Sequence, residues 1–112
     1  MKRKNSLPGI LKITKIDGFL IYCLFDTGEA RVIDFKKVLE NWKPRAGQIG
    51  FELYDFEQFK QVIVLGDTLA WPQILISFPD FENPEKMREA PLDLDPIVLY
   101  EHSVPPSSFA SR

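Results

Sequence analysis

The side chains that could support catalysis or metal binding are few in this sequence. His102 is the only histidine and Cys23 the only cysteine. A Ser-His-Asp or Cys-His arrangement would have to use His102, and a metal site built on two histidines is excluded. We expect His102 to end a helix, where a histidine commonly contacts terminal carbonyl groups or solvent. Cys23 stands in the apolar run from Phe19 to Phe25 and is expected to pack as a small hydrophobe.

Acidic side chains gather between residues 80 and 95, namely Asp80, Glu82, Glu85, Glu89, Asp93 and Asp95. They could be interpreted as a calcium site or as a carboxylate pair for general acid-base catalysis. However, no EF-hand pattern is present, and Asp95 before Pro96 has the form of a helix N-cap. We therefore expect a solvated acidic surface, no metal and no cofactor. The alternative is a ligand-binding or enzymatic site that combines segment 80–95 with Tyr100 and His102.

The charge and glycine distribution argue against nucleic acid and nucleotide partners. Lys and Arg number 14 against 16 Asp and Glu, so the net charge of -2 creates no field that attracts phosphates. The only local basic run is 2–4, expected to be a solvated tail, with a phosphate-binding arm as the alternative. The six glycines are scattered singly rather than grouped in a phosphate-binding loop. The aromatic residues lack interleaved Lys and Arg and are expected to form a core: Phe19, Phe25, Phe56, Phe59 and Trp71.

Length and composition indicate one ordinary globular domain. The chain has 112 residues, of which 45% are hydrophobic and 27% are charged. One cysteine cannot close an intramolecular disulfide, and no span of about 20 apolar residues or apolar leader is present. We therefore expect a cytoplasmic, reduced protein without membrane association. Because no catalytic constellation stands out, we expect it not to be an enzyme.

The first half of the sequence predicts a β meander followed by a helix. Three strands are expected at 10–16, 19–25 and 30–33, joined by turns at Asp17-Gly18 and at 26–28. The strand at 19–25 is apolar on both faces, so we expect it to be central and covered on both sides. Asp34 is expected to cap a helix at 35–42, whose apolar residues share one face: Phe35, Val38, Leu39 and Trp42.

The second half predicts a hairpin and further short helices. We expect an extended link at 50–53, a helix capped by Asp55 with Gln58 in a capping box, and a hairpin at 62–71 ended by Pro72. The remaining expected elements are a strand at 74–78, a helix started by Asn83-Pro84 and stopped by Pro91, and a last helix from Asp95-Pro96. The prediction is an α+β fold, an antiparallel meander and hairpin packed against two or three short helices. The domain spans 10–102, with flexible tails at 1–9 and 103–112.

Several segments together resemble a bacterial family called domain of unknown function 2442. The most specific are the Trp71-Pro72 pair and the Leu92-Asp93-Leu94-Asp95-Pro96 segment followed by Leu99-Tyr100-Glu101. Phe59 to Val62, the 25–28 turn and the helix opening at Asp34 add to the resemblance. The resemblance implies a fold and a protein partner rather than a mechanism. We expect Trp71, Pro72, Asp95, Pro96 and Tyr100 to be structural. Some members are joined to a helix-turn-helix domain, and some are encoded beside a second short protein in apparent toxin-antitoxin pairs.

This sequence departs from that family at residues 73–91. In the family the Trp-Pro turn runs almost directly into an N-G-A-D-L-D-P segment, and here 73–91 intervene without an asparagine-glycine pair. No helix-turn-helix is expected, so DNA-binding regulation is not implied. The segment mixes acidic residues and three prolines with apolar residues, Ile74, Leu75, Ile76, Phe78 and Phe81. We expect a surface hairpin arm or loop that contacts a protein partner or a second copy, because the meander also leaves a strand edge uncovered. The expected function is a non-enzymatic interaction module, antitoxin-like or accessory.

Overall fold

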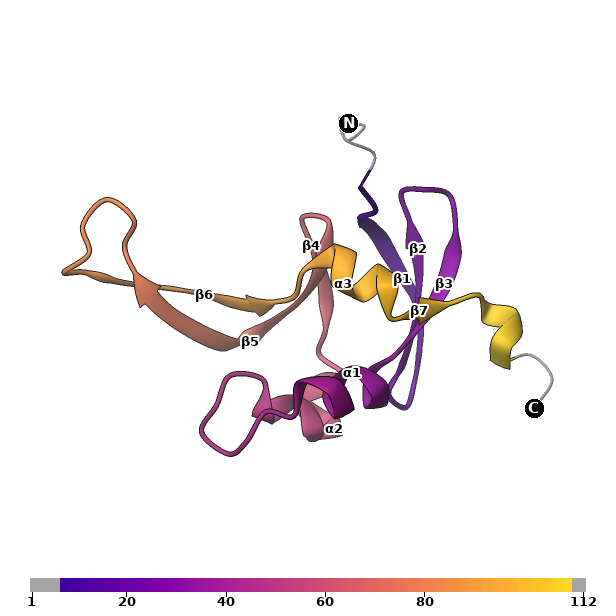
Figure 1. The fold of residues 1–112 in the computed structure, drawn as a ribbon, viewed down its shortest axis with the longest axis horizontal. Helices are drawn as coiled ribbons and strands as arrows, with labels where there is room; N and C mark the ends of the chain where they lie inside the picture. Colours follow the sequence, from indigo (N-terminus) through magenta and orange to yellow (C-terminus); the bar gives the residue numbers. More distant parts are fainter. Residues whose placement is uncertain (1–6, 110–112) are drawn as a thin grey trace.

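Two antiparallel sheets organise the computed structural model, which describes residues 7–109 (Figure 1). The first sheet has the order β1-β2-β3-β7, formed by Ile10–Asp17, Leu20–Phe25, Ala30–Asp34 and Ser103–Val104. The second has the order β4-β5-β6, formed by Ile63–Leu65, Thr68–Pro79 and Met87–Asp93. The α-helices are α1 (Phe35–Trp42), α2 (Phe56–Phe59) and α3 (Pro96–Glu101), and the 3-10 helices are η1 (Phe51–Tyr54) and η2 (Pro106–Phe109). The α+β fold class predicted from the sequence is confirmed.

Strand β2 is the central strand of the meander, as predicted. It pairs with β1 on one side, Ile13 opposite Cys23, and with β3 on the other, Ile33 opposite Ile21. Its side chains alternate between a fully buried face that includes Ile21 and Cys23 and a half-buried face that includes Tyr22. The expectation that both faces are covered is therefore wrong, because successive side chains point to opposite faces and only one of them meets the core.

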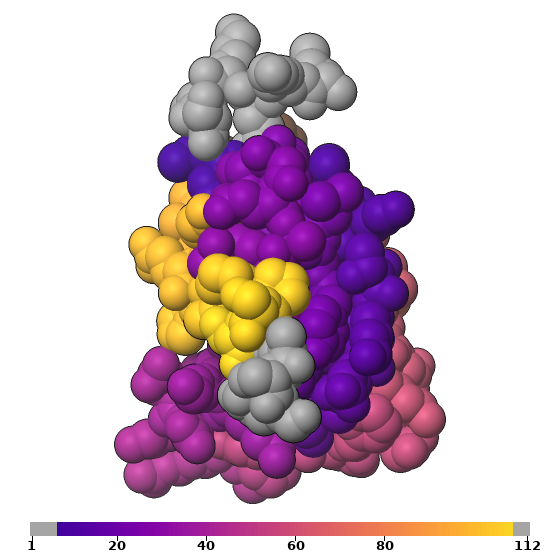
Figure 2. Space-filling model, turned by 90° about the vertical axis from the view of Figure 1, so that its right-hand side faces the viewer, coloured from indigo at the N-terminus to yellow at the C-terminus, as the bar shows by residue number. Residues whose placement is uncertain are grey.

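The sequence predicts a flexible tail at 103–112, but residues 103–109 belong to the fold. Strand β7 pairs with β3, Val104 opposite Val32 and Ser103 opposite Ile33. Figure 2 shows this segment, in yellow, lying against the purple strands of the first sheet. Val32 is completely buried there, although it lies on the outer face of the sheet. Residues 1–6 of the expected N-terminal tail and 110–112 lie outside the described residues.

Helix α1 begins and ends where the sequence predicts. The Oδ1 atom of Asp34 accepts a hydrogen bond from the backbone N–H of Lys36 at 3.1 Å, which satisfies one of the free donors of the first turn. The predicted apolar stripe faces the core, with Phe35 and Leu39 among its buried members. The helix ends at Lys43, whose left-handed backbone turns its N–H back to the carbonyl oxygen of Leu39 at 2.8 Å.

The segment between α1 and β4 is more helical than expected. Residues 50–53 were expected to be extended, but 51–54 form the 3-10 helix η1. Asp55 caps α2 as predicted, because its Oδ1 accepts from the N–H of Glu57 at 3.0 Å. Gln58 does not return to Asp55 as a capping box requires. Its side-chain oxygen instead accepts from Gln73, 3.1 Å away, which ties α2 to β5.

Strand β5 continues past Pro72, where we expected the hairpin to end. The pairing with β6 shifts register between Trp71 and Leu75. Pro72 lies within this irregularity, where the missing N–H of a proline costs no hydrogen bond between the strands. The helix expected after Asn83-Pro84 is also wrong. That stretch forms a turn and then β6, because the long strand β5 offers it a partner for backbone hydrogen bonds.

One core joins both sheets and the helices. Trp71, Phe35 and Phe59 are fully buried, and their rings pack within 5.1 to 6.2 Å of one another between centroids. The backbone N–H of Ile10 in β1 donates to the carbonyl oxygen of Asp67 in the β4–β5 turn at 2.7 Å. This contact links the start of the first sheet to the second.

Candidate protein-interaction surface

The outer part of the β5–β6 hairpin projects from the body, and we call residues 73–91 the arm (Figure 1). Strand β4 pairs only with residues 68–70 of β5, so the arm consists of two strands alone. The Cα radius of gyration is 15.1 Å, whereas a compact domain of this length has about 13 Å. A two-stranded hairpin is marginally stable in water without something packed on it. The arm is therefore the part of the fold that most lacks a covering element.

The two faces of the arm differ. Ile74 is only 7% exposed and belongs to the core, and Ile76 on the same face is half-buried against it. The expectation that Ile74 is exposed is thus wrong, because the irregularity between Trp71 and Leu75 turns this side chain toward the body. Leu75 and Met87, on the opposite face, are 56% and 62% exposed. Phe78 is also exposed, farther along the arm than Ile76. Of the apolar side chains expected to contact a partner, Leu75, Phe78 and Phe81 are exposed.

Phe81 stands at the tip of the arm and is 98% exposed. The turn that carries it is held by hydrogen bonds. The N–H of Asp80 donates to the carbonyl oxygen of Lys86 at 2.8 Å, and that of Lys86 to the carbonyl oxygen of Asn83 at 2.9 Å. The carboxylate of Asp80 accepts from the N–H of Glu82 at 2.9 Å. An ordered acidic turn therefore presents a phenylalanine to solvent.

Proline residues occupy both strands of the arm. Pro79 lies opposite Met87, and Pro91 lies opposite Leu75. A proline in a strand has no N–H to donate, and it is tolerated where that position faces outward from the ladder. Each edge of the arm consequently lacks a donor that an added strand would need. Contacts with a partner are better served by the faces and the tip than by strand addition.

A groove of about 670 Å³ lies where the base of the arm meets η1 and α2. Phe51 and Tyr54 form one wall, with ring centroids 5.8 Å apart, and Leu75 belongs to the arm side. The side-chain amide of Gln73 donates to the carbonyl oxygen of Gln58 at 2.9 Å, which fixes the base of the arm on α2. The exposed apolar surface of the arm therefore continues onto the body.

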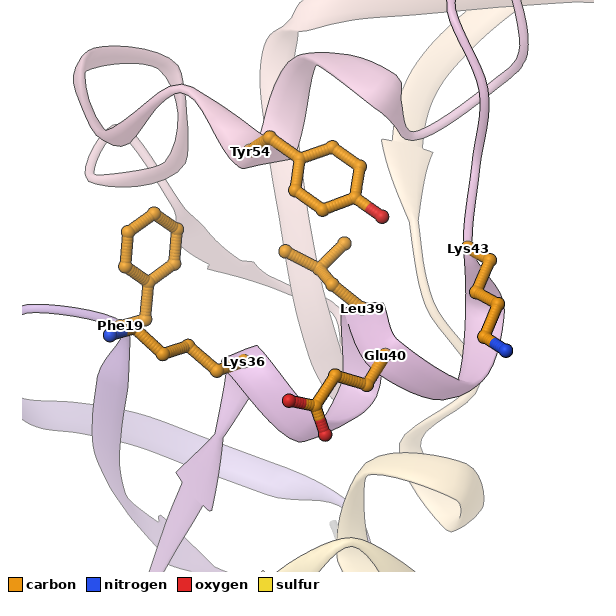
Figure 3. A pocket seen from close by; sticks show the side chains of 6 residues that line it. All are labelled: Phe19, Lys36, Leu39, Glu40, Lys43 and Tyr54. Atoms are coloured by element: carbon orange, nitrogen blue, oxygen red, sulfur yellow. The ribbon is translucent and has the colours of Figure 1, made fainter.

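A second cavity, which we call the α1 pocket, has a volume of about 730 Å³ and is lined by Phe19, Lys36, Leu39, Glu40, Lys43 and Tyr54 (Figure 3). In this view Leu39 lies below the ring of Tyr54, the ring of Phe19 stands to the left of both, and the side chains of Lys36 and Lys43 lie at opposite ends. Among residues 7–109, neither lysine forms an ion pair. The pocket thus combines an apolar floor with unpaired positive charge at its rim.

Of the acidic segment 80–95 and its expected partners, the structure places Asp95 and His102 on the lining of one cavity of about 340 Å³, whereas Tyr100 and the other acids of the segment do not line it. Asp95 caps α3 as predicted, accepting from the N–H of Ile97 at 2.8 Å, with Pro96 in the first turn. The ring Nδ1 of His102 lies 2.9 Å from the carbonyl oxygen of Val98, and its Nε2 lies 3.1 Å from the Asn41 amide. In the part of the chain that the structure describes, no group of three or more His, Cys, Asp or Glu side chains could hold a metal ion.

Tyr100 instead joins α3 to the first sheet. Its hydroxyl donates to Glu29 at 2.6 Å, and the Arg31 guanidinium carbon lies 4.6 Å from the centroid of its ring. Arg31 also pairs with Glu29 at 3.2 Å and donates to the carbonyl oxygen of Ser103 at 2.8 Å. The hydrogen bond from Tyr100 is the main reason that the pKa of Glu29 is lowered, and the same bond raises the pKa of Tyr100. The sequence gives no signal for this cluster, because Glu29 and Tyr100 are far apart along the chain.

Cys23 is unsuited to nucleophilic chemistry. Its side chain is buried in the core, and burial raises the pKa of the thiol to about 12. A thiol with such a pKa carries almost no thiolate at neutral pH, and the thiolate is the reactive form. The structural position therefore agrees with the packing role expected from the apolar run around it.

No helix within residues 7–109 is long and apolar enough to cross a membrane. Comparison with known proteins adds no relative, since no family model, curated protein or solved structure matches this chain. The resemblance to the domain of unknown function 2442 family stays a prediction that rests on the motifs around Trp71-Pro72 and Asp95-Pro96.

Proposed function

We propose that this protein is a non-enzymatic protein–protein interaction module and that the arm is its contact element. The observation that carries the proposal is Phe81, which is 98% exposed at the end of an ordered turn. Burying a phenylalanine side chain is worth roughly 1.5–3 kcal/mol, and the folded chain forgoes this gain at Phe81. A partner that covers the tip gains this burial free energy on binding. The exposed Leu75 and Met87 extend the same apolar surface toward the body.

The chemistry of the tip favours a protein over other partners. Asp80 and Glu82 flank Phe81, and Glu85 follows in the same turn. Negative charge repels the phosphates of nucleic acids and of anionic membrane surfaces. A protein surface with an apolar pocket and basic rim satisfies both the ring and the carboxylates. An antitoxin-like or accessory role in a two-protein pair is the form of this function that the family resemblance implies.

The test compares three tagged full-length chains purified from the cells that produce the protein naturally: the parent, Phe81→Ser and Leu65→Ser. Leu65 is an exposed leucine of β4, away from the arm, so its variant controls for loss of an exposed apolar side chain. We expect one companion protein, or additional untagged copies of the chain, with the parent and Leu65→Ser but not with Phe81→Ser. Binding of the purified companion is then measured by calorimetry. Identical captures by all three chains would count against the arm as the contact element.

A further inference from the structure

We infer that the partner of the arm is a second copy of this chain, with Phe81 of one copy seated in the α1 pocket of the other. The inference rests on the proposed function and names the partner for it. The chain carries an exposed aromatic knob at the arm tip and a pocket elsewhere on its surface. The tip and the pocket are both apolar and carry opposite charge. Two copies related by a two-fold axis can form this contact twice.

The floor of the α1 pocket suits a phenyl ring. Phe19, Leu39 and Tyr54 all line the cavity and supply its apolar surface (Figure 3). Aromatic pairs prefer edge-to-face or offset arrangements, and the rings of Phe19 and Tyr54 offer an inserted Phe81 such contacts. The volume of about 730 Å³ leaves room for the ring together with part of the turn that carries it.

The charges of the two surfaces are complementary. The turn 80–86 carries three acidic residues, Asp80, Glu82 and Glu85, against one base, Lys86, and Arg88 beside the turn pairs with Asp80 at 4.0 Å. Glu82 and Glu85 form no ion pair among the described residues. The pocket lining carries two bases, Lys36 and Lys43, against one acid, Glu40. Neither lysine is engaged in an ion pair in the described part of the chain. Insertion of the tip thus brings an excess of carboxylates to an excess of unpaired ammonium groups, which favours encounter and fixes orientation.

The same chain cannot satisfy both surfaces by itself. Phe81 is almost completely exposed, so it touches little of its own chain, and the arm extends away from α1 (Figure 1). A knob and a pocket on one chain can be satisfied twice when two copies exchange arms around a two-fold axis. The second contact then forms within an already joined pair, which raises the total affinity above that of either contact.

Sedimentation equilibrium of the purified full-length chain over a range of micromolar concentrations tests this inference. We expect a reversible equilibrium between the 12.9 kDa monomer and a dimer. Phe81→Ser should weaken dimerisation by at least about tenfold, as truncation of an interface anchor does, and Lys36→Glu combined with Lys43→Glu should weaken it similarly. Leu65→Ser is the control and should dimerise like the parent. Phe81 is at the tip, Lys36 and Lys43 line the α1 pocket, and Leu65 lies outside both surfaces. Urea melts of each variant verify folding.

A charge-reversed chain distinguishes the α1 pocket from other contacts. Adding Glu82→Lys and Glu85→Lys to the double lysine variant exchanges the signs of the two surfaces, and we expect it to restore dimerisation. Asp80 is left unchanged because it holds the turn. A charge-reversed chain that stays monomeric, or a dimer that persists in Phe81→Ser, would overturn the inference. A parent that is monomeric throughout would also overturn it, while a companion protein lost only with Phe81→Ser would leave the proposed function standing.

Discussion

The indole Nε1 of Trp71 donates a hydrogen bond to the carbonyl oxygen of Phe59 at 2.9 Å, deep in the core. This bond lets a ring with a polar atom be buried completely, because the N–H is satisfied by the last residue of α2. It also fixes α2 relative to β5, the strand from which the arm extends. Trp71 therefore supports the base of the arm from within the body.

Truncation of this ring should unfold much of the population. We expect Trp71→Ala to lower the free energy of unfolding by about 3–5 kcal/mol, because a large cavity opens among Phe35, Phe59 and the strands. Trp71→Phe should cost less, about 1 kcal/mol for the lost hydrogen bond, since the Phe59 carbonyl still accepts from the N–H of Val62 at 3.2 Å. Urea unfolding measures both. A Trp71→Phe variant as stable as the parent would show that the indole hydrogen bond contributes nothing.

The cap of α3 provides a second stability test. Asp95→Ala removes the side-chain acceptor of the Ile97 N–H and should lower the free energy of unfolding by about 1 kcal/mol. Asp93→Ala is the matched control, because Asp93 is exposed two positions earlier and makes no side-chain hydrogen bond or ion pair among the described residues. The difference between the two midpoints in urea reports the cap. Equal midpoints would assign the effect to lost charge instead.

Local signals explain which elements could be predicted from the sequence. Helix α1 and the caps at Asp34, Asp55 and Asp95 depend on residues that are close together in the sequence. The structure contains the helix and all three caps. The sequence predicts a helix where strand β6 forms, because Asn83-Pro84 is typical of a helix start and Pro91 of a helix end. The segment forms a strand because it pairs with β5, and this long-range pairing leaves no signal in the local sequence.

The candidate site, like the fold, was predictable only where its signal lies in neighbouring residues. The exposed apolar residues of the arm could be named, because apolar side chains among acids and prolines stand out along the chain. Ile74 was misplaced, since its burial depends on the register shift after Trp71. The α1 pocket could not be foreseen at all. Its lining combines β1–β2, α1 and η1, whose proximity is a property of the folded chain.

The contact between Glu29 and Tyr100 predicts a pH-dependent contribution to stability. The pKa of Glu29 is lowered from 4.5 in the folded protein, first by the Tyr100 hydrogen bond. A lowered carboxyl pKa stabilises the fold above the unfolded pKa, and this contribution is lost as pH falls through the folded pKa. The pKa of Tyr100 is raised from 10.0, so its own contribution is fully present below 10.0 and is lost as pH rises from there through the raised value. Between pH 4.5 and 10.0 the contribution of the pair is constant.

We therefore expect Tyr100→Phe to be less stable than the parent at neutral pH, with a difference that shrinks as pH falls below 4.5. The ring and its contact with Arg31 are retained in this variant, so the change isolates the hydroxyl. Urea midpoints across the acid range measure the difference. Tyr54→Phe is the control, because Tyr54 lies on the surface and its hydroxyl makes no hydrogen bond within residues 7–109. A difference that stays constant into acid would contradict the role of the Glu29 carboxylate.

Gly50 provides the last prediction, because the packing of Trp42 depends on it. A Cβ atom at Gly50 would lie 2.3 Å from two carbons of the Trp42 ring, closer than real Cβ contacts come. The backbone of Gly50 has φ +98°, which L side chains rarely adopt. Gly47 also has positive φ, +85°, but a Cβ there meets nothing within 4 Å. Alanine substitutions at Gly50 and at Gly47 therefore distinguish the effect of the steric clash from the effect of backbone strain.

Both alanine variants should lose about 1–2 kcal/mol of stability for the backbone conformation. Gly50→Ala should lose a further 1–3 kcal/mol or so, about the range for overpacking, because the Trp42 ring must shift away from η1. The change in Trp42 position should also alter the tryptophan fluorescence of Gly50→Ala and not that of Gly47→Ala, with both measured in urea melts. Equal stability of the two variants, with unchanged fluorescence, would mean that Trp42 does not pack on this glycine.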